Sequence, residues 1–435
     1  MKKTLLTICL VWMCFSLSAQ KIIDLSGKWS FSIDRQDNGE KEKWFSHTLN
    51  DCINLPGSMP EKLKGDEVTA KTQWTGSLYD SSYYYNPYME KYRKEGNIKF
   101  PFFLTPDKHY VGAAWYQKEV NIPADWKGER ILLFLERPHI ETTVWVNGQK
   151  TGMQNSLCVP HQYDITHYVR PGKCIKEINV GPDSHSITDQ TQGNWNGIVG
   201  RICLQTTPKT YFDDIQIYPE PEQKLARVKV VIKGTGTAKV KLSAESFNTD
   251  KKHIVPAIQQ EIKLNKGVTE TEMVLPMGND MLLWDEFHPA LYKLKAEVTN
   301  GKKTEIKEIQ FGMRRFEIKG KWFYVNGRKT QLRGTVENCD FPLTGYAPMD
   351  VESWERVFRI CRSYGLNHMR FHSFCPPEAA FMAADRVGFY LQPEGPSWPN
   401  HGPKLGLGQP IDKYLMDETI ALTKEYGNYA SYCML

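Results

Sequence analysis

The last hundred residues of the chain carry polar side chains placed where chemistry can occur, because each follows a short apolar run. Six of them are candidates for ligand contact: Arg370, Glu337, Asn338, His372, Glu394 and Trp398. The runs before them read as strands that alternate with helices, and the carboxyl ends of parallel strands meet at one rim. We therefore expect these six side chains to lie along that rim and to line a substrate pocket.

Structural roles remain as alternatives for some of these residues. Glu337, Glu394 and Trp398 lie in expected loops, where side chains often cap helices or pair with one another instead of binding a ligand. For Arg370 the alternative to lining the pocket is a structural salt bridge. His368 and His372 share one face of an expected strand, but they are far apart for one ion and no carboxylate completes a ligand set. The sequence therefore predicts neither a metal site nor a cofactor.

Three helices are expected between and after these strands. Asp350 caps the first helix, whose apolar residues recur at i, i+3, i+4 and i+7, and Gly365 ends it. The second helix follows Pro376-Pro377 and is expected to end near Gly388, and the third runs from about 412 to 425. A fourth strand begins at 432–435. This order predicts the first half of a TIM (β/α)8 barrel, over residues 313–435.

The strand over 366–371 decides which side chains face the interior of that barrel. Alternation places His368 and Arg370 on one face and Met369 and Phe371 on the other. Methionine and phenylalanine suit the layer beneath the outer helices, so His368 and Arg370 are expected to point inward.

The chain before the barrel has an all-β pattern. Residues 20–208 contain short alternating strands and the hairpin signal Asn147-Gly148, and they predict a jelly-roll β-sandwich. Residues 209–312 have the length and alternation of an immunoglobulin-like β-sandwich, with separate strands expected at 228–232 and 238–242. An aromatic insertion at 78–108 interrupts the first sandwich, and it either reaches a ligand or packs against its own domain.

The amino terminus predicts export. Lys2 and Lys3 precede an apolar run over 5–17 and a small-residue exit at Ala19, so residues 1–19 read as a signal peptide. No later segment approaches 18 apolar residues, so no membrane span is expected. A net charge of +5 without a basic stripe gives no nucleic-acid signature. The mature protein is expected to be periplasmic or extracellular.

Eight cysteines follow the expected signal peptide. They are scattered, without a CxxC motif or zinc spacing: Cys52, Cys158, Cys174, Cys203, Cys339, Cys361, Cys375 and Cys433. We expect mostly buried thiols rather than a disulfide framework, although export permits a bridge.

A collinear set of motifs runs through nearly the whole mature chain. The motifs are Trp145-Val146-Asn147-Gly148, Trp195-Asn196-Gly197-Ile198-Val199-Gly200-Arg201, Pro289-Ala290-Leu291-Tyr292-Lys293-Leu294, Phe311-Gly312-Met313-Arg314, Val325-Asn326-Gly327, Arg333-Gly334, Asn367-His368-Met369-Arg370 and Asp385-Arg386-Val387-Gly388-Phe389-Tyr390. Together they resemble glycoside hydrolase family 2, the group of β-galactosidases, β-glucuronidases and β-mannosidases.

The resemblance implies a carbohydrate substrate and a retaining mechanism. Two glutamates about 5 Å apart then act as acid/base and as nucleophile. The family's acid/base follows an Asn after strand four, which here would come after Leu435, so neither catalytic carboxylate is expected within this chain. Arg370 matches a family position that lines the pocket and orients carboxylates. His372 departs from the family pattern, because the spacing here is Arg-x-His rather than Arg-x-x-His.

Three functions remain open at this point. The first is an exported β-glycosidase of which this chain is a truncated, inactive product, and the second is a carbohydrate-binding protein without catalysis. The third is a half-enzyme completed by a separate chain. We favour the first, because a partial barrel leaves open strand edges and an uncovered apolar interior. The identity of the sugar and a homo-oligomer of the full-length enzyme stay open.

Overall fold

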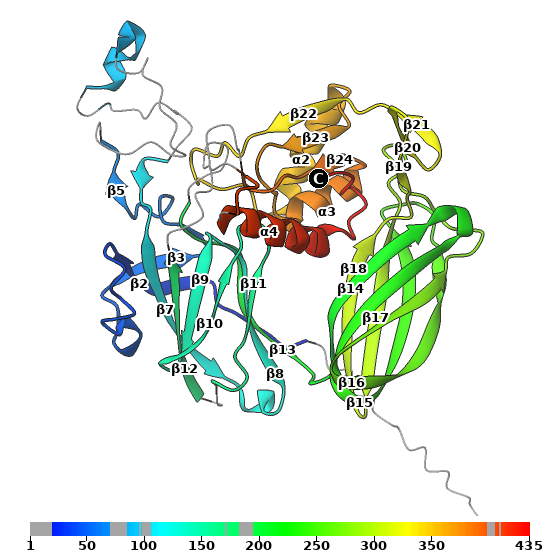
Figure 1. Cartoon of the computed structure of the whole chain (residues 1–435), viewed down its shortest axis with the longest axis horizontal. Coiled ribbons are helices and arrows are strands. Elements are labelled where there is room, and N and C mark those ends of the chain that lie inside the picture. Colours follow the sequence, from blue (N-terminus) through cyan, green and yellow to red (C-terminus); the bar gives the residue numbers. More distant parts are fainter. Residues whose placement is uncertain are drawn as a thin grey trace, which may run out of the picture.

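Three units follow one another along the chain, and the third lies between the upper ends of the first two (Figure 1). The computed structural model describes residues 20–69, 85–94, 97, 106–169, 172–181, 195–397, 405–408 and 410–435. The expected signal peptide 1–19, most of the aromatic insertion at 78–108, and Trp398 lie outside the described residues. None of the helices in the described part is long and apolar enough to cross a membrane.

The first unit is a sandwich of two antiparallel sheets. One sheet has the order β1 (Ile22–Asp24), β13 (Gly197–Thr207), β8 (Arg130–Pro138), β11 (His161–Asp164), with β4 (Gly57–Ser58) also paired to β13. The other has the order β10 (Gln149–Asn155), β9 (Glu141–Val146), β12 (Gly172–Gly181), β7 (Ala113–Ile122), β2 (Gly27–Asp34), β3 (Asp51–Leu55). A separate pair joins β5 (Asp66–Glu67) to β6 (Lys108–His109).

The expected hairpin turn of this sandwich is confirmed. Asn147 and Gly148 both have positive φ, at 52° and 76°, and they connect β9 to β10. Only residues that tolerate the left-handed region fit such a two-residue turn. Trp29, Tyr116 and Leu133 are buried in the core of this sandwich.

The second unit is a β-sandwich of five long strands. They are β14 (Tyr211–Glu220), β15 (Leu225–Phe247), β16 (Ile254–Pro276), β17 (Leu291–Asn300) and β18 (Lys303–Phe311). The prediction of separate strands at 228–232 and 238–242 was wrong, because both belong to β15. The register of β15 shifts between Gly234 and Gly236, and Gly236 has a φ of 83°. The strand therefore bends, so that its first half pairs with β14 and its second half with β17.

The third unit opens with the small sheet β19 (Phe316–Lys319), β20 (Trp322–Val325) and β21 (Arg328–Thr330). The parallel strands β22 (Gly334–Glu337), β23 (His368–Phe371) and β24 (Tyr390–Gln392) then alternate with the helices α2 (Val351–Ser363), α3 (Glu378–Val387) and α4 (Pro410–Tyr426). Leu391 also makes a parallel bridge to Tyr432, where a fourth strand was expected.

The ends of two of these helices follow the sequence signals. The Asp350 side chain accepts a hydrogen bond from the Ser353 amide at 2.8 Å and so caps α2. Gly388 ends α3 with a φ of 75°, a conformation in which a side chain would be strained.

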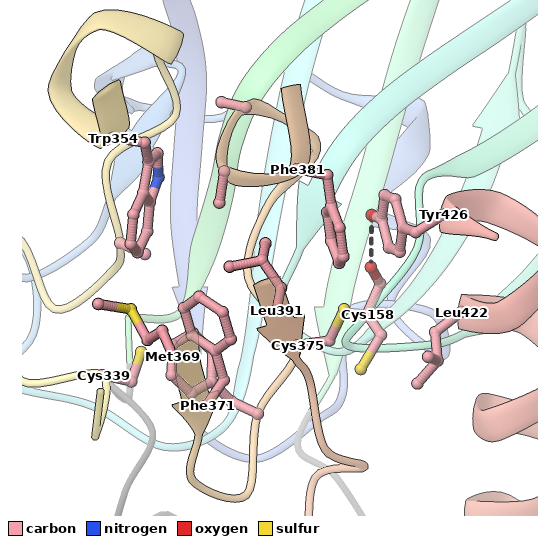
Figure 2. Close-up of a cluster of buried hydrophobic side chains, with 14 of the residues drawn as sticks. Cys158, Cys339, Trp354, Met369, Phe371, Cys375, Phe381, Leu391, Leu422 and Tyr426 are labelled. Atoms are coloured by element: carbon pink, nitrogen blue, oxygen red, sulfur yellow. Dashed lines mark hydrogen bonds between the residues drawn. The ribbon is translucent and has the colours of Figure 1, made fainter. Parts of the chain in front are cut away.

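One apolar cluster joins the third unit to the first (Figure 2). Met369, Phe371 and Leu391 of the strands lie beneath residues of the helices such as Trp354 and Phe381, and Cys158 of the first sandwich completes the cluster. Because this core is shared, the strands that carry the candidate site are positioned by both units.

Candidate functional site

The two faces of β23 are divided as the sequence predicted. Met369 and Phe371 are 3% and 0% exposed in the shared core, whereas the Arg370 side chain is 40% exposed. The parallel register places Val336 beside Arg370, and Glu337 beside Phe371. Arg370 therefore lies on the side of the sheet away from the helices, which is the interior side of a barrel.

The structure brings Arg370 and Glu394 together. The Arg370 Nε donates to Glu394 Oε1 at 2.5 Å, and the Ser373 amide donates to the other carboxylate oxygen at 2.7 Å. The Glu394 amide in turn donates to the Phe374 carbonyl at 3.1 Å. A guanidinium and a backbone amide thus hold this carboxylate just beyond the carboxyl end of β24. Arg370 keeps part of its surface toward solvent, where a ligand hydroxyl or carboxylate could accept a hydrogen bond.

Glu337 lies toward the helical layer. Its register partner is the buried Phe371, and its Oε1 accepts from the Cys339 amide at 2.9 Å. Burial raises the pKa of Glu337, while the hydrogen bond from Cys339 opposes that shift. The charge of Glu337 also contributes to the raised pKa of Cys361 on α2, after the larger effect of burial. The carboxyl group is therefore near α2 and not in the row that contains Arg370.

The remaining candidate residues are more dispersed. Asn338 is exposed, and the His372 amide donates to the Glu337 carbonyl at 2.9 Å, which extends the β22–β23 pairing by one step. Trp398 lies outside the described residues. Substrate contact stays a prediction for all six residues, and Arg370 with Glu394 is the pair that the geometry favours most.

Gly334 of β22 and His368 of β23 are register partners in the sheet that carries Arg370. A Cβ atom at Gly334 would lie 2.5 Å from His368 Nδ1, so a larger residue would displace the imidazole. Burial lowers the pKa of His368, and a hydrogen bond with the Gln392 side chain opposes that shift. His368 Nε2 has no hydrogen-bond partner within the described part of the chain. The lowered pKa favours the neutral form of His368, which lies two residues before Arg370 on β23.

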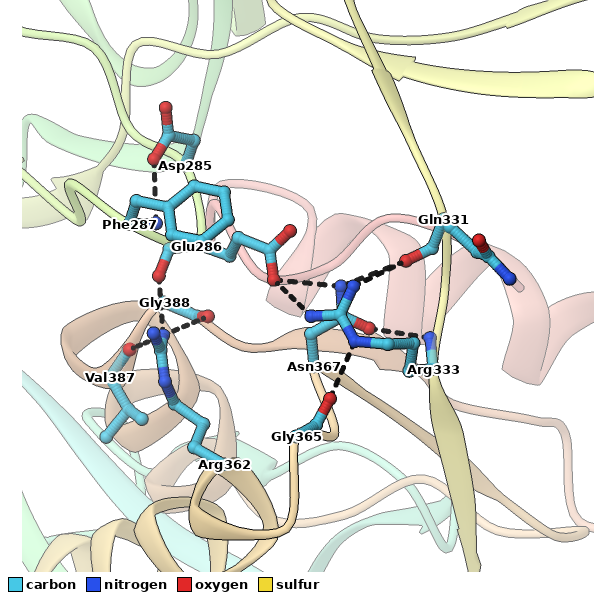
Figure 3. A network of polar contacts seen from close by, with 10 residues as sticks. All are labelled: Asp285, Glu286, Phe287, Gln331, Arg333, Arg362, Gly365, Asn367, Val387 and Gly388. Atoms are coloured by element: carbon cyan, nitrogen blue, oxygen red, sulfur yellow. Dashed lines mark hydrogen bonds and ion pairs between the residues drawn. The ribbon is translucent and has the colours of Figure 1, made fainter.

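A polar network links the amino-terminal ends of β22 and β23 to the second sandwich (Figure 3). Glu286 Oε2 accepts from an Arg333 terminal nitrogen at 3.0 Å and from Asn367 Nδ2 at 2.9 Å. Asn367 Oδ1 accepts from the Arg333 amide at 2.7 Å, and Arg333 Nε donates to the Gly365 carbonyl at 2.6 Å. The motif residues Arg333 and Asn367 therefore set the positions at which β22 and β23 begin.

Two further contacts with the second sandwich hold the helices α2 and α3 in position. Arg362 on α2 donates to the Glu286 carbonyl at 2.5 Å (Figure 3). Asp385 on α3 accepts from the Ser431 amide and the Gln310 side chain, both at 2.7 Å. Burial raises the pKa of Asp385 to about 6, against the effect of these hydrogen bonds. The contacts of Glu286 with the third unit could not be predicted from the sequence, because Glu286 belongs to no recognisable motif.

The first sandwich also contacts the third unit through buried residues whose roles could not be predicted from the sequence. Glu418 on α4 is 2% exposed and accepts from the amides of Leu157 and Cys158 at 2.7 and 2.8 Å. Arg137 is buried, with 6% of its surface exposed, and it donates to the carbonyls of Cys158 and Cys375. An isolated glutamate or arginine in a sequence reveals no partner, so these contacts required the structure.

A cavity of about 980 Å³ lies between the first sandwich and the loop that connects β22 to α2. Arg201 spans its wall, because it donates to Glu136 at 2.9 Å and to Glu378 at 2.7 Å. None of the candidate residues that the structure describes lines this cavity. It is separate from the rim that holds Arg370 and Glu394.

The fold and its rim site can be compared with known proteins. A model of the glycosyl hydrolases family 2 sugar binding domain matches residues 22–208, and a second model, glycosyl hydrolases family 2, matches residues 210–314. The β-galactosidase large subunit of Latilactobacillus sakei is 23% identical over 400 residues, which are 89% of this chain and 61% of that protein. Human β-glucuronidase is 22% identical over 420 residues, which are 86% of this chain and 57% of that protein.

Solved structures show the same architecture. A glycosyl hydrolase family 2 member from Bacteroides cellulosilyticus matches with a TM-score of 0.68 at 19% identity, over 94% of this chain and 52% of that chain. A β-glucuronidase of Bacteroides uniformis matches with a TM-score of 0.68 at 17% identity, over 95% of this chain and 46% of that chain.

Two sandwiches in this order, followed by parallel strands and helices, define a multidomain glycosidase architecture. The chain belongs to glycoside hydrolase family 2. The predicted jelly-roll and immunoglobulin-like sandwiches are thereby confirmed. The chain spans roughly half of the two solved chains and about three fifths of the two relatives named above.

Proposed function

We propose that the whole protein is an exported, retaining β-glycosidase and that this chain supplies its sugar-binding sandwich, its spacer and one wall of its substrate pocket. The observation that carries the proposal is the Arg370–Glu394 pair, held at the carboxyl ends of parallel strands in a family 2 chain. Relatives with this architecture are named β-galactosidases and β-glucuronidases, so a β-linked hexose or hexuronic acid is the expected substrate class. Lys2, Lys3 and the apolar run after them support export.

The role proposed for Arg370 is to position charge. Its guanidinium fixes Glu394 at 2.5 Å and presents its remaining N–H groups to the rim. A planar, permanently charged donor can orient a sugar carboxylate, a hydroxyl or a neighbouring catalytic carboxylate. An Arg370→Lys change in the full-length enzyme should therefore weaken catalysis, because lysine cannot reproduce the two-sided contact.

The chain by itself is proposed to be inactive. Retaining hydrolysis requires two carboxylates about 5 to 5.5 Å apart across the glycosidic bond. Of the two glutamates predicted at the rim, Glu394 is engaged by Arg370 and the Ser373 amide, and Glu337 lies toward α2. Neither is free to act as one member of an acid and nucleophile pair. The catalytic glutamates are therefore proposed to come from the part of the enzyme that these residues do not include.

The test uses the protein encoded by the full gene and aryl β-galactosides, β-glucuronides and β-mannosides. The full-length protein is expected to release the aryl group from one of these, with the β-configuration kept in the first sugar product seen by proton NMR. Inversion at the anomeric carbon would refute the retaining mechanism. Failure to hydrolyse any of the three, together with glycan-array binding, would favour the alternative of a carbohydrate-binding protein, which the match of residues 22–208 to a sugar binding domain also fits.

A further inference from the structure

Two buried thiols from different units meet at the interface between the first sandwich and the third unit. Cys158 lies in the loop between β10 and β11, and Cys375 lies in the loop between β23 and α3. Each is 1% exposed, both are free thiols, and the Cys375 thiol contributes to the raised pKa of Cys158, after the larger effect of burial. Figure 2 shows the two sulfur atoms close to each other in the view, on the side of Leu391 toward α4.

The backbones of these two cysteines are held together by one shared partner, Arg137, and two further residues hold Cys158 in place. Arg137 is buried and donates to the Cys158 carbonyl at 2.8 Å and to the Cys375 carbonyl. Glu418 accepts from the Cys158 amide at 2.8 Å, and the Tyr426 hydroxyl donates to the Cys158 carbonyl at 2.8 Å. A disulfide requires its two Cα atoms to stay within about 4.4 to 6.8 Å. One guanidinium that reaches both carbonyls keeps the two segments adjacent without a covalent bond.

We propose that Cys158 and Cys375 form a disulfide that ties the sugar-binding sandwich to the candidate-site loop of the barrel. A disulfide compound such as oxidised glutathione serves as the oxidant. One thiolate attacks it, forms a mixed disulfide and releases one glutathione. The second cysteine then displaces the second glutathione, so that two thiols are oxidised and one disulfide compound is reduced. Formation in the cell rests on the proposed export, because exported proteins meet an oxidising compartment.

The bond is expected to form before the interface closes. Burial raises the pKa of the Cys158 thiol, and the nearby Arg137 offsets this only in part. A thiol in that state is a weak nucleophile, because only the thiolate attacks a disulfide. Oxidation should therefore be fast during folding and slow once the reduced protein is folded.

A disulfide between Cys158 and Cys375 would directly restrain the loop that binds Glu394. The loop that contains Cys375 also contains Ser373 and Phe374, which bind the carboxylate and the amide of Glu394. A covalent tie at Cys375 therefore restrains the loop that holds Glu394 against Arg370. Reduction would loosen this loop without removing any of its hydrogen-bonding groups.

Cys339 provides a matched control. It is also buried, and it lines the same small void of about 20 Å³ as Cys158 and Cys375. In Figure 2 it lies on the opposite side of the cluster, next to Met369. The proposed bridge leaves Cys339 reduced, although its burial is similar to that of the other two cysteines.

The test refolds residues 20–435 from the reduced, denatured state with a mixture of reduced and oxidised glutathione. Free thiols are then alkylated in denaturant, and the protein is digested without reduction and analysed by mass spectrometry. A peptide that joins Cys158 to Cys375 is expected, with Cys339 alkylated. Complete alkylation of Cys158 and Cys375 would overturn the proposal, and so would a bridge that involves Cys339. This wild-type experiment depends on neither export nor activity, so its failure is distinct from a failure of the proposed function.

Variants add a second measurement. Cys158→Ser and Cys375→Ser should each lack the linked peptide, whereas Cys339→Ser should keep it. The oxidised wild-type and Cys339→Ser proteins should unfold about 5 °C or more above their reduced forms. The unfolding temperatures of the Cys158→Ser and Cys375→Ser proteins should not respond to reductant. An equal response in all four proteins would contradict the proposal, and the Cys158→Ala and Cys375→Ala variants replace any serine variant that fails to fold.

Discussion

Glu418 offers the most direct way to measure how firmly the first sandwich holds the third unit. Its buried carboxylate accepts from the amides of Leu157 and Cys158, and its second oxygen accepts from the Ser156 hydroxyl at 2.7 Å. Glu418→Gln retains one carbonyl oxygen of nearly the same shape but removes the charge. The change therefore isolates the charge-assisted part of these hydrogen bonds.

The expected magnitude follows from the two amide bonds. A hydrogen bond to a charged group contributes about 1.5 to 3 kcal/mol, and a neutral one contributes about 0.5 to 1.5 kcal/mol. Losing the difference twice predicts that Glu418→Gln lowers the free energy of unfolding by about 2 kcal/mol. Glu418→Ala leaves both amides without an acceptor, and the expected loss rises to about 4 kcal/mol. Asp417→Asn on the same helix removes an exposed pair with Lys413 and should change the free energy by less than about 0.5 kcal/mol.

The assay combines urea unfolding with hydrogen exchange of the amides at Leu157 and Cys158. Glu418→Gln should speed exchange at these two amides by roughly 30-fold, since 1.4 kcal/mol corresponds to a factor of ten. Asp417→Asn should leave exchange at both amides near its wild-type rate. If Glu418→Gln and Asp417→Asn shifted the urea midpoint equally, the Glu418 carboxylate would not be a link between the units.

Two further stability predictions concern the contacts with the second sandwich. Asp385 has a pKa raised to about 6 from an unfolded value of about 3.9, so the folded state binds the extra proton and wild-type stability falls as pH rises through this window. Asp385→Asn lacks this titration, so the difference between its free energy of unfolding and that of wild type should shrink by about 2 to 3 kcal/mol between pH 4 and pH 7. Denaturant titrations at both pH values measure this difference. A difference that grew with pH would contradict the predicted direction of the pKa shift. Asn367→Asp sets a second carboxylate against Glu286 and should lower stability by about 3 kcal/mol or more at pH 7, less at pH 4 where carboxylates take up protons. An equal loss at both pH values would show that charge repulsion is not the cause.

Local features of the fold could be predicted because the residues that cause them are adjacent in sequence. The turn at Asn147-Gly148 needs two residues that accept positive φ, and the caps at Asp350 and Gly388 need a short acceptor and a residue without a side chain. The faces of β23 followed from strict alternation around Arg370. Each of these depends on only a few consecutive positions.

Features that depend on distant partners could not be predicted. Separate strands were expected at 228–232 and 238–242, but β15 continues through Gly234 and Gly236 because β16 pairs with it on both sides of the bend. Glu286 and Glu418 belong to no motif in the sequence, and the residues of other units that they bind lie 47 or more residues away.

The candidate site shows the same limit. The strand order predicted that Arg370 and Glu394 lie at the same rim, because both are at carboxyl ends of parallel strands. It did not predict that the two side chains form a pair. Glu337 seemed equivalent to Glu394, yet the register pairs it with Phe371 and turns it toward α2. Alternation fixes the relative faces along one strand, but it does not fix the register between strands.

We have proposed that these residues form one wall of a glycosidase pocket and that neither Glu337 nor Glu394 acts as a catalytic carboxylate. The most direct measurement compares release of 4-nitrophenol from β-galactosides and β-glucuronides by residues 20–435 and by the protein of the full gene, at equal concentration. We predict turnover by the full protein and none above the uncatalysed rate by residues 20–435. Turnover by residues 20–435 that Glu337→Gln or Glu394→Gln abolished, in a variant that still folds, would show that one of these glutamates is catalytic and would contradict the proposal.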